Sequence, residues 1–462
     1  EIIRKNKLII YELNEVPEKV LFDFIRKFPN STLKNFIDNG FFIRTETLDK
    51  GELHPWSTWP TVYRGITNDI HSIKYINQDL SKINKEFPNV WNILEKKGLK
   101  IGIFGSLQSY PPLNSDNVKF YIPDTFSPES NCFPSNLNIF QEFNLQLCNE
   151  NKAISKKISF KSLILFIRLC LSGKISFSSI ARIFLHVILE KINPNFRKKR
   201  AFIQAIINFD LYKKLLQKNN IDFSTFFTNH VAATMHRYWK DAYGYSERTS
   251  YKNKFSSKLI MQSMELVDKQ IKFLNNYSKK NNYDLWIISS MGQDSINRGT
   301  YIPETTLKNF EKLIEGLSLK INSYKLMPAM QPDICIKCKS YNALNNLKIA
   351  IRDLTDFDNN YLLNYRYKTD SLSINLSITT SQSLYKNKKL IYKKKSYRLQ
   401  EFGFELITRD PGTAYHIKEG IFLGNNDNKK FLKNLNKETL NTTFIFKLIL
   451  DFFEINHPKY IK

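Results

Sequence analysis

Cysteine, long hydrophobic runs and acidic side chains are all scarce in this chain. It has five cysteines in 462 residues, and such a small, odd number argues against a disulfide framework and for a reducing compartment. No segment reaches the ~20 apolar residues of a membrane span, and the opening EIIRKNKLIIYEL is too short an apolar run for a signal peptide. These absences predict a soluble, cytoplasmic protein, with membrane-peripheral attachment as the alternative.

The shortage of acidic residues leaves an excess of positive charge. Lys and Arg number 69 against 43 Asp and Glu, which gives a net charge of +26 at pH 7. Lys, Asn, Ile and Phe are abundant together, a pattern typical of an AT-rich genome that raises the Lys content without a functional cause. The other explanation is a basic surface facing phosphates, nucleic acid or anionic lipid. Nucleic acid is the least expected of these partners, because the sequence contains no recognised nucleic-acid-binding motif.

The residues that are present favour an α/β core. Hydrophobic residues make up 42% of the chain and aromatic residues 14%, which argues against disorder as the main state. Nearly continuous apolar runs predict strands at 7–13 and 283–290, and capped amphipathic patterns predict helices at 17–27, 31–40 and 256–277. Strands that alternate with helices in this way predict a mostly parallel central sheet with helices on both faces.

Two segments interrupt that alternation. Residues 150–215 are helical and basic, and we expect an insertion packed on the main domain, with contact to a membrane surface or an anionic partner as the alternative. Residues 325–400 carry short strand patterns and predict a small α+β subdomain; Cys335 and Cys338, within it, are expected to be structural. The predicted order is core (1–149), helical insertion (150–215), core (216–324), α+β subdomain (325–400) and core (401–462).

Polar residues follow the first strand and the next conspicuous turn. The segment 12-ELNE-15 places Glu12, Asn14 and Glu15 at the carboxyl edge of the strand, where open α/β sheets bind their ligands. The segment 52-ELHPWSTWPTVYRGITNDIHSI-73 carries Ser57 and Thr58 into a helix. Hydroxyls at a helix N-terminus are suited to attack on phosphorus or sulfur, because the helix end stabilises an anion. They are also ordinary N-caps, so both roles remain open.

Three histidines stand near predicted strand ends. His230 and His236 lie six residues apart in 223-FSTFFTNHVAATMHRYW-239, which is not the i,i+4 spacing of a helical metal-binding pair. Either the chain bends between them or only one of them binds a metal. His416, in 408-TRDPGTAYHIKEGIFLG-424, follows a Pro-Gly turn and precedes a strand. A single histidine in a loop is usually structural, but polar segments at several strand ends favour convergence on one site.

The ordered set of these motifs resembles the alkaline phosphatase superfamily, nearest to its phosphodiesterase, nucleotide pyrophosphatase and sulfatase branches. The resemblance runs through ELNE, PNSTLKNFIDNG, the hydroxyl-bearing turn, WIISSMG and GTAYHIKEG. It covers roughly 7–110, 222–300 and 405–425 and leaves both insertions unexplained. The chain also resembles relatives from bacterial surface-polysaccharide clusters. Members of the superfamily hold two divalent ions, commonly zinc, which polarise a phosphoryl group and activate a Ser, Thr or modified Cys nucleophile.

The resemblance implies a role for each matching residue. Asn14 and Glu15 fall where the family has its first Asp ligands, and His236 and His416 match its late His and its final ligand. The nucleophile position is matched best by Thr58, with Ser57 beside it. A third histidine ligand would be His230. The residues expected to contact substrate are Glu12, Trp59 and Arg64.

The departures from the family pattern predict a reduced metal site. Ala232 stands where an Asp is expected four residues before His236, and Ser290-Met291 replaces the usual Asp-His pair. Ser and Met are poor ligands for zinc, so we expect at most one divalent metal, zinc or manganese. Gly65 follows Thr58 by seven residues instead of the usual ten, and a strict count puts the nucleophile at Pro55, which cannot serve.

Two functions therefore remain open. The first is a hydrolase or transferase on a phosphate or sulfate ester, in surface-polysaccharide metabolism, with an anionic ester or glycan as substrate. The second is a catalytically inactive relative that binds a glycan, a nucleotide-sugar or a protein partner. The loss of the Asp-His pair favours the second, whereas retention of His236 and His416 favours the first.

Overall fold

The larger of the chain's two compact units folds around one central sheet. The structure, a computed structural model, describes residues 6–76, 78–149, 159–244, 254–297, 302–327, 329, 333–365, 372–407, 412–425 and 439–461. Its eight-stranded sheet has the order β19-β2-β18-β6-β1-β5-β3-β4. All neighbouring pairs are parallel except those that β18 makes with β2 and β6. The strands are β1 (Leu8–Leu13), β2 (Phe41–Glu46), β3 (Ile101–Phe104), β4 (Val118–Ile122), β5 (Phe223–Thr228), β6 (Asp284–Ile288), β18 (Glu419–Gly424) and β19 (Thr439–Asn441).

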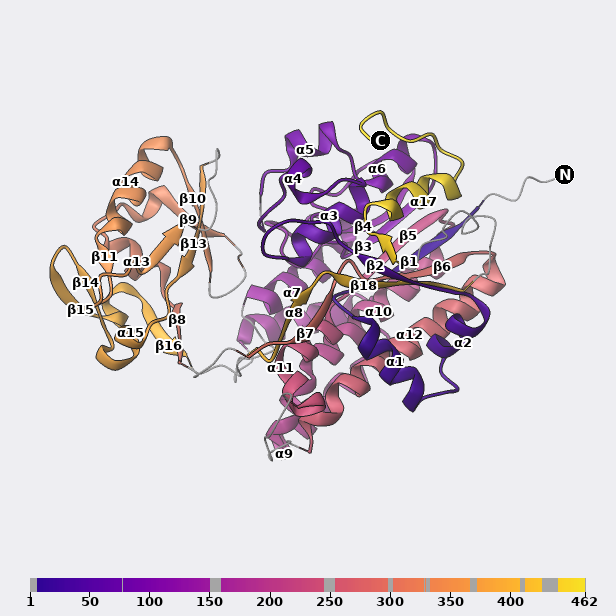
Figure 1. Cartoon of the computed structure of the whole chain (residues 1–462), viewed down its shortest axis with the longest axis horizontal. Coiled ribbons are helices and arrows are strands. Elements are labelled where there is room, and N and C mark those ends of the chain that lie inside the picture. Colours follow the sequence, from indigo (N-terminus) through magenta and orange to yellow (C-terminus); the bar gives the residue numbers. More distant parts are fainter. Residues whose placement is uncertain are drawn as a thin grey trace. The chain divides into compact units, whose positions relative to one another are not determined.

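Helices cover both faces of this sheet, which confirms the predicted α/β class (Figure 1). The residues of β1 alternate between two hydrophobic cores: Ile9, Tyr11 and Leu13 enter one, and Leu8 and Ile10 enter the other. The first core is covered by α1 (Glu18–Lys27), α2 (Thr32–Asn39), α7 (Asn138–Asn149), α8 (Phe160–Leu171), α10 (Arg200–Lys218), α11 (His230–Tyr243) and α12 (Leu259–Asn281). The second core is covered by α3 (Pro55–Arg64), α6 (Val90–Lys96) and α17 (Phe444–Phe452).

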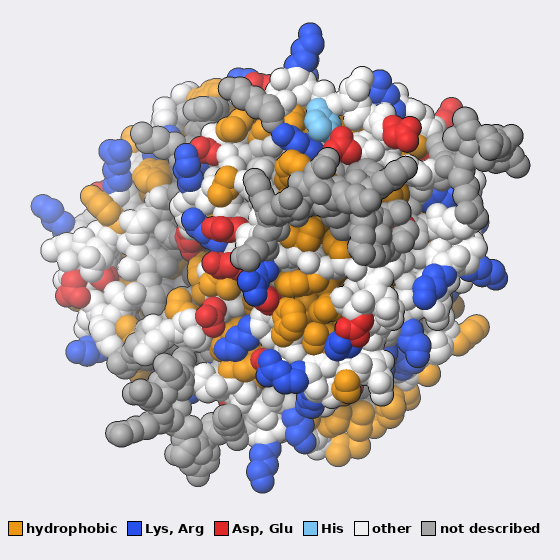
Figure 2. Space-filling view, turned by 45° about the vertical axis from the view of Figure 1, so that its right-hand side comes forward, with side chains coloured by type: hydrophobic (Ala, Val, Ile, Leu, Met, Phe, Trp, Pro, Cys, Tyr) orange, Lys and Arg blue, Asp and Glu red, His pale blue; other side chains and the backbone are white. Residues whose placement is uncertain are grey.

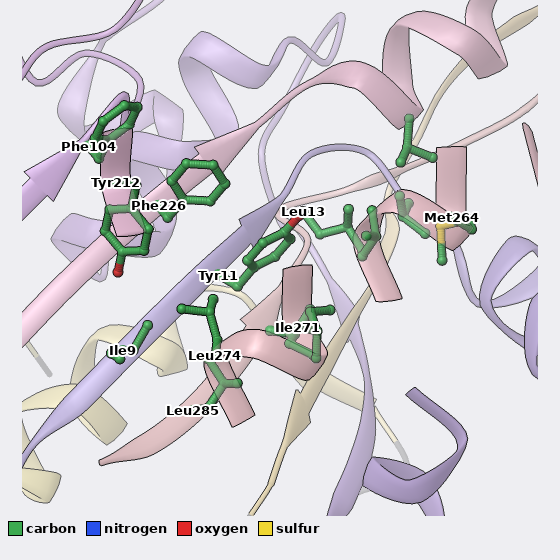
Figure 3. Packing of buried hydrophobic residues seen from close by; sticks show 14 of the residues in the cluster. Ile9, Tyr11, Leu13, Phe104, Tyr212, Phe226, Met264, Ile271, Leu274 and Leu285 are labelled. Atoms are coloured by element: carbon green, nitrogen blue, oxygen red, sulfur yellow. The ribbon is translucent and has the colours of Figure 1, made fainter. Parts of the chain in front are cut away.

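Aromatic rings fill the first core beside β1. Figure 3 shows Tyr11 between the strand residue Phe226 and the α12 residues Ile271 and Leu274. The Tyr11 hydroxyl donates to Gln270 Oε1 at 2.5 Å, so the buried phenol is not left without a partner. This packing fixes β1 in the middle of the sheet, and the strand's carboxyl end carries the polar residues of the site.

The remaining helices of the larger unit include those of the predicted basic segment. Outside 150–158, which lie beyond the described residues, the segment forms α8, α9 (Phe177–Ile192), a 3-10 stretch (Pro194–Lys199) and most of α10. Short helices α4 (Asn68–His71) and α5 (Ser81–Glu86) follow α3. Within the described ranges, no helix combines the length and apolar character needed to cross a bilayer.

A second compact unit consists of residues 298–411 together with 74–79. It holds a four-stranded antiparallel sheet of order β12-β13-β10-β9, a three-stranded sheet β11-β14-β15 and the pair β16-β8. Its strands are β8 (Glu304–Leu307), β9 (Tyr324–Met327), β10 (Ile334–Cys338), β11 (Leu354–Thr355), β12 (Leu363–Tyr365), β13 (Ser373–Ile378), β14 (Lys389–Tyr392), β15 (Lys395–Arg398) and β16 (Phe404–Ile407). Its helices are α13 (Phe310–Gly316), α14 (Tyr341–Arg352) and α15 (Gln382–Asn387). Cys335 and Cys338 are buried, free thiols in this unit.

Candidate functional site

The carboxyl end of β1 presents a buried carboxylate. The strand ends at Leu13, and Glu15 follows with a φ of 59°, a left-handed backbone conformation that is uncommon for a residue with a side chain. Such strain is usually retained at functional sites. The Glu15 side chain is almost fully buried. The backbone therefore turns sharply where the sheet ends and leaves a charged group inside the protein.

His236 reaches the same place from α11. The strand β5 lies beside β1, and α11 begins two residues after β5 ends. Thr413 N–H donates to the His236 carbonyl at 2.6 Å, which ties the helix to the segment that leads into β17 (Ala414–Ile417). The Nδ1 atom of His236 lies 2.9 Å from the Ala414 carbonyl, so Nδ1 carries the proton and Nε2 faces the site.

His416 is presented by β17, which pairs with β7 (Gly292–Ser295). Its Nδ1 atom lies 2.6 Å from the Leu53 carbonyl, just before α3, and this contact also leaves Nε2 facing the site. Opposite His416 in the pair stands Gln293. The neighbouring Gly292 is required by close packing, since a Cβ atom there would lie 2.3 Å from the Glu419 carbonyl oxygen. The 408–411 part of this predicted motif lies outside the described residues.

Three ligand-type side chains therefore converge. Glu15 Oε2 lies 3.0 Å from His236 Nε2 and 3.3 Å from His416 Nε2. Among the described residues, this is the one group of three His, Cys, Asp or Glu side chains whose ligand atoms all lie within 4.8 Å of one another. The Glu15 and His416 side chains are only 3% and 7% exposed, whereas that of His236 is 30% exposed. The cluster is thus buried on two sides and reachable from solvent past His236.

Glu15 and His416 shift one another's pKa. Burial alone would raise the pKa of Glu15, but the facing imidazoles of His416 and His236 hold the pKa of this carboxyl well below its usual range. Burial would likewise lower the pKa of His416, but the Glu15 carboxylate raises it above its ordinary value. The site thus holds an ionised carboxylate against an imidazole that favours its charged form, and this charge distribution is suited to exchange a proton for a cation.

A second set of contacts holds Glu15 in place. Asn14 Nδ2 donates to Glu15 Oε1 at 2.7 Å, and Asn14 Oδ1 accepts from Trp59 Nε1 at 2.8 Å. Gln293 Nε2 donates to Glu15 Oε2 and to the Ala232 carbonyl, while its Oε1 atom is buried and no described residue is hydrogen-bonded to it. Asn14, predicted as a ligand, therefore positions Glu15, with its own oxygen engaged by Trp59.

His230 does not join the cluster, which corrects its prediction as a metal ligand. Its Nδ1 atom lies 2.8 Å from Thr228 Oγ1 and its Nε2 atom 3.1 Å from the Ser263 carbonyl, so both ring nitrogens are occupied. Burial lowers the pKa of His230 to about 4. Because α11 is continuous from His230 to Tyr243, residues six apart point in different directions around the helix.

The hydroxyls predicted as nucleophiles lie in the first turn of α3. Thr58 is fully buried, and its Oγ1 atom lies 2.8 Å from Ser290 Oγ. Ser57 is also buried, but its Oγ atom has no hydrogen-bond partner among the described residues. Ser290 and Met291 are both fully buried. The Thr58 and Ser290 hydroxyls thus bond to each other at this position.

The three residues predicted to contact substrate are buried in the second core or at its border, where they contact other parts of the protein. Glu12 accepts hydrogen bonds at Oε1 from Tyr63 and from Ser106, both at 2.6 Å, and burial raises the pKa of Glu12 to about 8. Trp59 is fully buried beside Asn14. Arg64 is fully buried and donates to the Phe87 carbonyl and to Asn84 Oδ1.

Another histidine at the site was not predicted. His54 is the N-cap residue of α3, its ring stacks on Trp56 at 4.3 Å, and it lies edge-on to His416 with the centroids 5.9 Å apart. The signal was present in the sequence, because His54 directly precedes the proline that opens the helix. Gln293 was also missed, although it stands in the SSMGQ segment directly after a predicted strand.

Comparison with known proteins gives likenesses at the level of the whole fold. No family model matches the chain, and no curated protein matches it. Among solved structures, murine ectonucleotide pyrophosphatase/phosphodiesterase 5 in complex with AMP is 11% identical, with a TM-score of 0.44, covering 98% of this chain and 96% of that one. The human ectonucleotide pyrophosphatase/phosphodiesterase 5 is also 11% identical, with a TM-score of 0.43 and the same coverage.

Phosphonoacetate hydrolase from Sinorhizobium meliloti 1021 in complex with phosphonoformate is 12% identical, with a TM-score of 0.43, covering 97% of this chain and 96% of that one. The low identities and TM-scores of these structural neighbours describe a likeness alone, so the chemistry of this site rests on the chain's own side chains.

Proposed function

We propose that this chain is a metal-dependent hydrolase or transferase of phosphate esters, with one divalent cation held by Glu15, His236 and His416. The observation that supports this best is the orientation of the two imidazoles. Each directs Nδ1 at a backbone carbonyl and Nε2 at the same carboxylate oxygen. Metal-binding histidines are commonly fixed by such a contact to the other ring nitrogen.

The donor set fits zinc or manganese. Two imidazole nitrogens and one carboxylate are a common set for catalytic zinc, which keeps a further position open for water or substrate. The two N···O separations of 3.0 and 3.3 Å are close to the ~3.3 Å edge of a tetrahedron whose bonds are about 2.0 Å long. A bound cation would supply Lewis acidity to a phosphoryl oxygen and offset its negative charge.

The chain's own residues would supply the rest of the chemistry. Ser57 is the better candidate for the nucleophile, because its hydroxyl has no hydrogen-bond partner in the described part of the chain, whereas that of Thr58 is engaged by Ser290. The Leu53 carbonyl contacts His416 directly, so the start of α3 lies beside the cluster, and a helix N-terminus stabilises an anionic phosphoryl group. The partly exposed His236 marks the side from which substrate enters.

The substrate class follows from charge. A net charge of +26 at pH 7 favours an anionic ester. Figure 2 shows Lys and Arg side chains scattered over the face it draws and not gathered in one patch, which fits general steering better than a single binding groove. Three further points stay predictions that rest on the resemblance. They are a glycan as part of the ester, sulfate in place of phosphate, and a role in surface-polysaccharide metabolism.

Metal content measured on protein purified without chelator tests this function. We expect about one zinc or manganese per chain in the wild type, none in His236→Ala or His416→Ala, and an unchanged content in His230→Ala. Hydrolysis of phosphodiester, phosphomonoester and sulfate ester probes then identifies the reaction. Absence of metal from the wild type, even after incubation with zinc and manganese, would contradict the proposed mechanism.

A non-catalytic binding role is supported by one specific observation. Ser290, Met291 and Thr58 leave the second metal position of the family without typical ligands, and Ser290 is bonded to Thr58. Metal-loaded protein that binds a phosphate or glycan probe without turnover, in wild type and Ser57→Ala alike, would favour this role over catalysis.

A further inference from the structure

The helices α8 and α9 present hydrophobic side chains to solvent at helical spacing. Of the twenty large hydrophobic side chains that are exposed among the described residues, ten lie in these two helices. On α8 the exposed set follows the spacing i, i+3, i+4, i+7 and i+11, which defines one stripe along the helix. This stripe consists of Phe160, Leu163, Ile164, Ile167 and Leu171.

The second helix repeats the pattern. The exposed hydrophobic side chains of α9 are Phe177, Phe184, Leu185, Ile188 and Ile192. The two most exposed of these side chains are Leu171 (82%), the last residue of α8, and Phe177 (91%), the first residue of α9. Each helix buries a different side: Leu165 and Leu169 of α8 lie in the first core, and Ile183 of α9 packs against it. The outward stripes are therefore additional to the faces that hold the helices on the protein.

The charges around these stripes are almost all positive. From Ser159 to Arg200 the sequence has nine Lys and Arg residues and a single acidic residue, Glu190. That one carboxylate is already paired with Arg197 and Arg200. On the helices themselves, the exposed basic residues are Lys161, Arg168, Arg182 and Lys191.

We propose that α8 and α9 bind the surface of an anionic lipid bilayer, with their exposed hydrophobic stripes inserted into the headgroup region and their basic side chains on lipid phosphates. Interfacial helices combine these two features, an apolar face with Phe and Leu and a border of Lys and Arg. The helices have 12 and 16 residues, so they are about 18 and 24 Å long and too short to cross a ~30 Å hydrocarbon core. They lie on the membrane and do not span it.

Charge favours lipid over a second copy of the chain. In a two-fold symmetric dimer through this face, the basic side chains of one copy would face the basic surface of the other, with Glu190 already paired with Arg197 and Arg200. Anionic lipid instead supplies the opposite charge and an apolar phase together. The proposal does not depend on the metal site, because none of the cluster residues belongs to these helices.

Vesicle co-sedimentation tests the proposal on the full chain. The probe is phosphatidylcholine vesicles with about one third phosphatidylglycerol, compared with pure phosphatidylcholine. We expect binding to the anionic vesicles that weakens as salt is raised, and at least ~10-fold weaker binding by Leu171→Gln/Phe177→Gln. Arg182→Gln/Lys191→Gln should reduce binding to anionic vesicles only.

Matched controls separate this surface from general stickiness. Tyr341→Gln/Ile349→Gln removes two hydrophobic side chains from α14 that are each 64% exposed, and Lys279→Gln/Lys280→Gln removes two exposed charges from α12. Neither should change binding. Failure of the wild type to bind either vesicle, or equal loss in test and control variants, would overturn the proposal. A dimer that Leu171→Gln/Phe177→Gln dissociates, without vesicle binding, would assign the surface to a second copy.

Discussion

Glutamate and histidine side chains occur both at the carboxyl edge of the sheet and in the interior just beneath it, but they have different roles in the two places. Glu15 and Glu12 lie three residues apart and are both buried, but facing imidazoles hold the pKa of Glu15 well below its usual range, whereas burial raises that of Glu12 to about 8. His236 and His230 belong to one helix, but His236 directs Nε2 at a carboxylate and His230 has both nitrogens occupied. The partners of a side chain, and not its type or its burial, decide whether it can bind a ligand.

The sharpest test of this comparison is Glu15→Gln, which keeps the shape of the side chain and removes its charge. We expect metal affinity to fall by more than ~100-fold, because an amide is a poor substitute for the carboxylate of such a site. Elemental analysis and calorimetric titration with zinc measure the change. Glu12→Gln is the matched control, and equal metal loss in both variants would show that the two glutamates do not differ as proposed.

Glu12→Gln should instead change how stability depends on pH. Because the folded-state pKa of Glu12 is raised from 4.5 to about 8, the native state retains a proton that the unfolded state releases. Wild-type stability therefore falls as pH rises from about 5 to about 8. We expect the variant to lose this pH dependence. Its free energy of unfolding should exceed that of the wild type by an amount that grows across this pH range to the order of a few kcal/mol. Urea unfolding at several pH values measures it, and parallel curves for the two proteins would contradict it.

His230→Ala should destabilise the fold and leave the metal in place. The substitution leaves a cavity and deprives Thr228 and the Ser263 carbonyl of their partner, at a cost of about 2–3 kcal/mol. The folded-state pKa of about 4 lies below the usual 6.5, so wild-type stability falls as pH drops from about 6.5 to about 4, and the variant should lack this component. Chemical unfolding measures the stability, and elemental analysis measures the metal content. We expect the reverse for His236→Ala, which should lose the metal and keep most of its stability.

The smallest expected effect belongs to Gln293→Ala. Gln293 donates to Glu15 Oε2 but has neither a carboxylate nor an imidazole with which to bind the metal. It therefore acts by holding the Glu15 carboxylate in place. We expect metal affinity to fall by about 10-fold with little change in unfolding free energy, the range typical of a residue behind a ligand. Gln293→Glu keeps the size of the side chain but replaces the donating amide with a second carboxylate. That carboxylate can itself bind the cation, so metal affinity should be higher than in Gln293→Ala; identical affinities would contradict the position given to this side chain.

The sequence predicted the main elements of the fold well. The apolar run at 7–13 contains β1, the pattern at 256–277 covers a 3-10 turn (Ser256–Lys258) and most of α12, and 283–290 contains β6. The helix predicted at 17–27 begins at Glu18, directly after Pro17. These elements are predictable because hydrophobic periodicity and capping residues act over a few neighbouring positions.

The residues of the candidate site were less predictable from the sequence. The segment ELNE indicated the correct strand end, but only the turn at Glu15 directs this side chain, and not Glu12, to the two histidines. Arg64 looked available for an anionic substrate and is instead used inside the protein. Spacing along the chain cannot separate such cases, because burial and hydrogen-bond partners come from distant segments.

The sequence by itself determined the α/β class, the strand ends that carry polar residues, and the excess of positive charge. Only the tertiary structure decided which of those residues meet, since Leu53, Ala414 and Gln293 are remote in sequence from the side chains that they orient. It also decided that α8 and α9 keep a hydrophobic stripe on the outside. Hydrophobic periodicity in the sequence predicts that a helix has an apolar face. Whether that face is covered depends on how the helix packs against the rest of the chain.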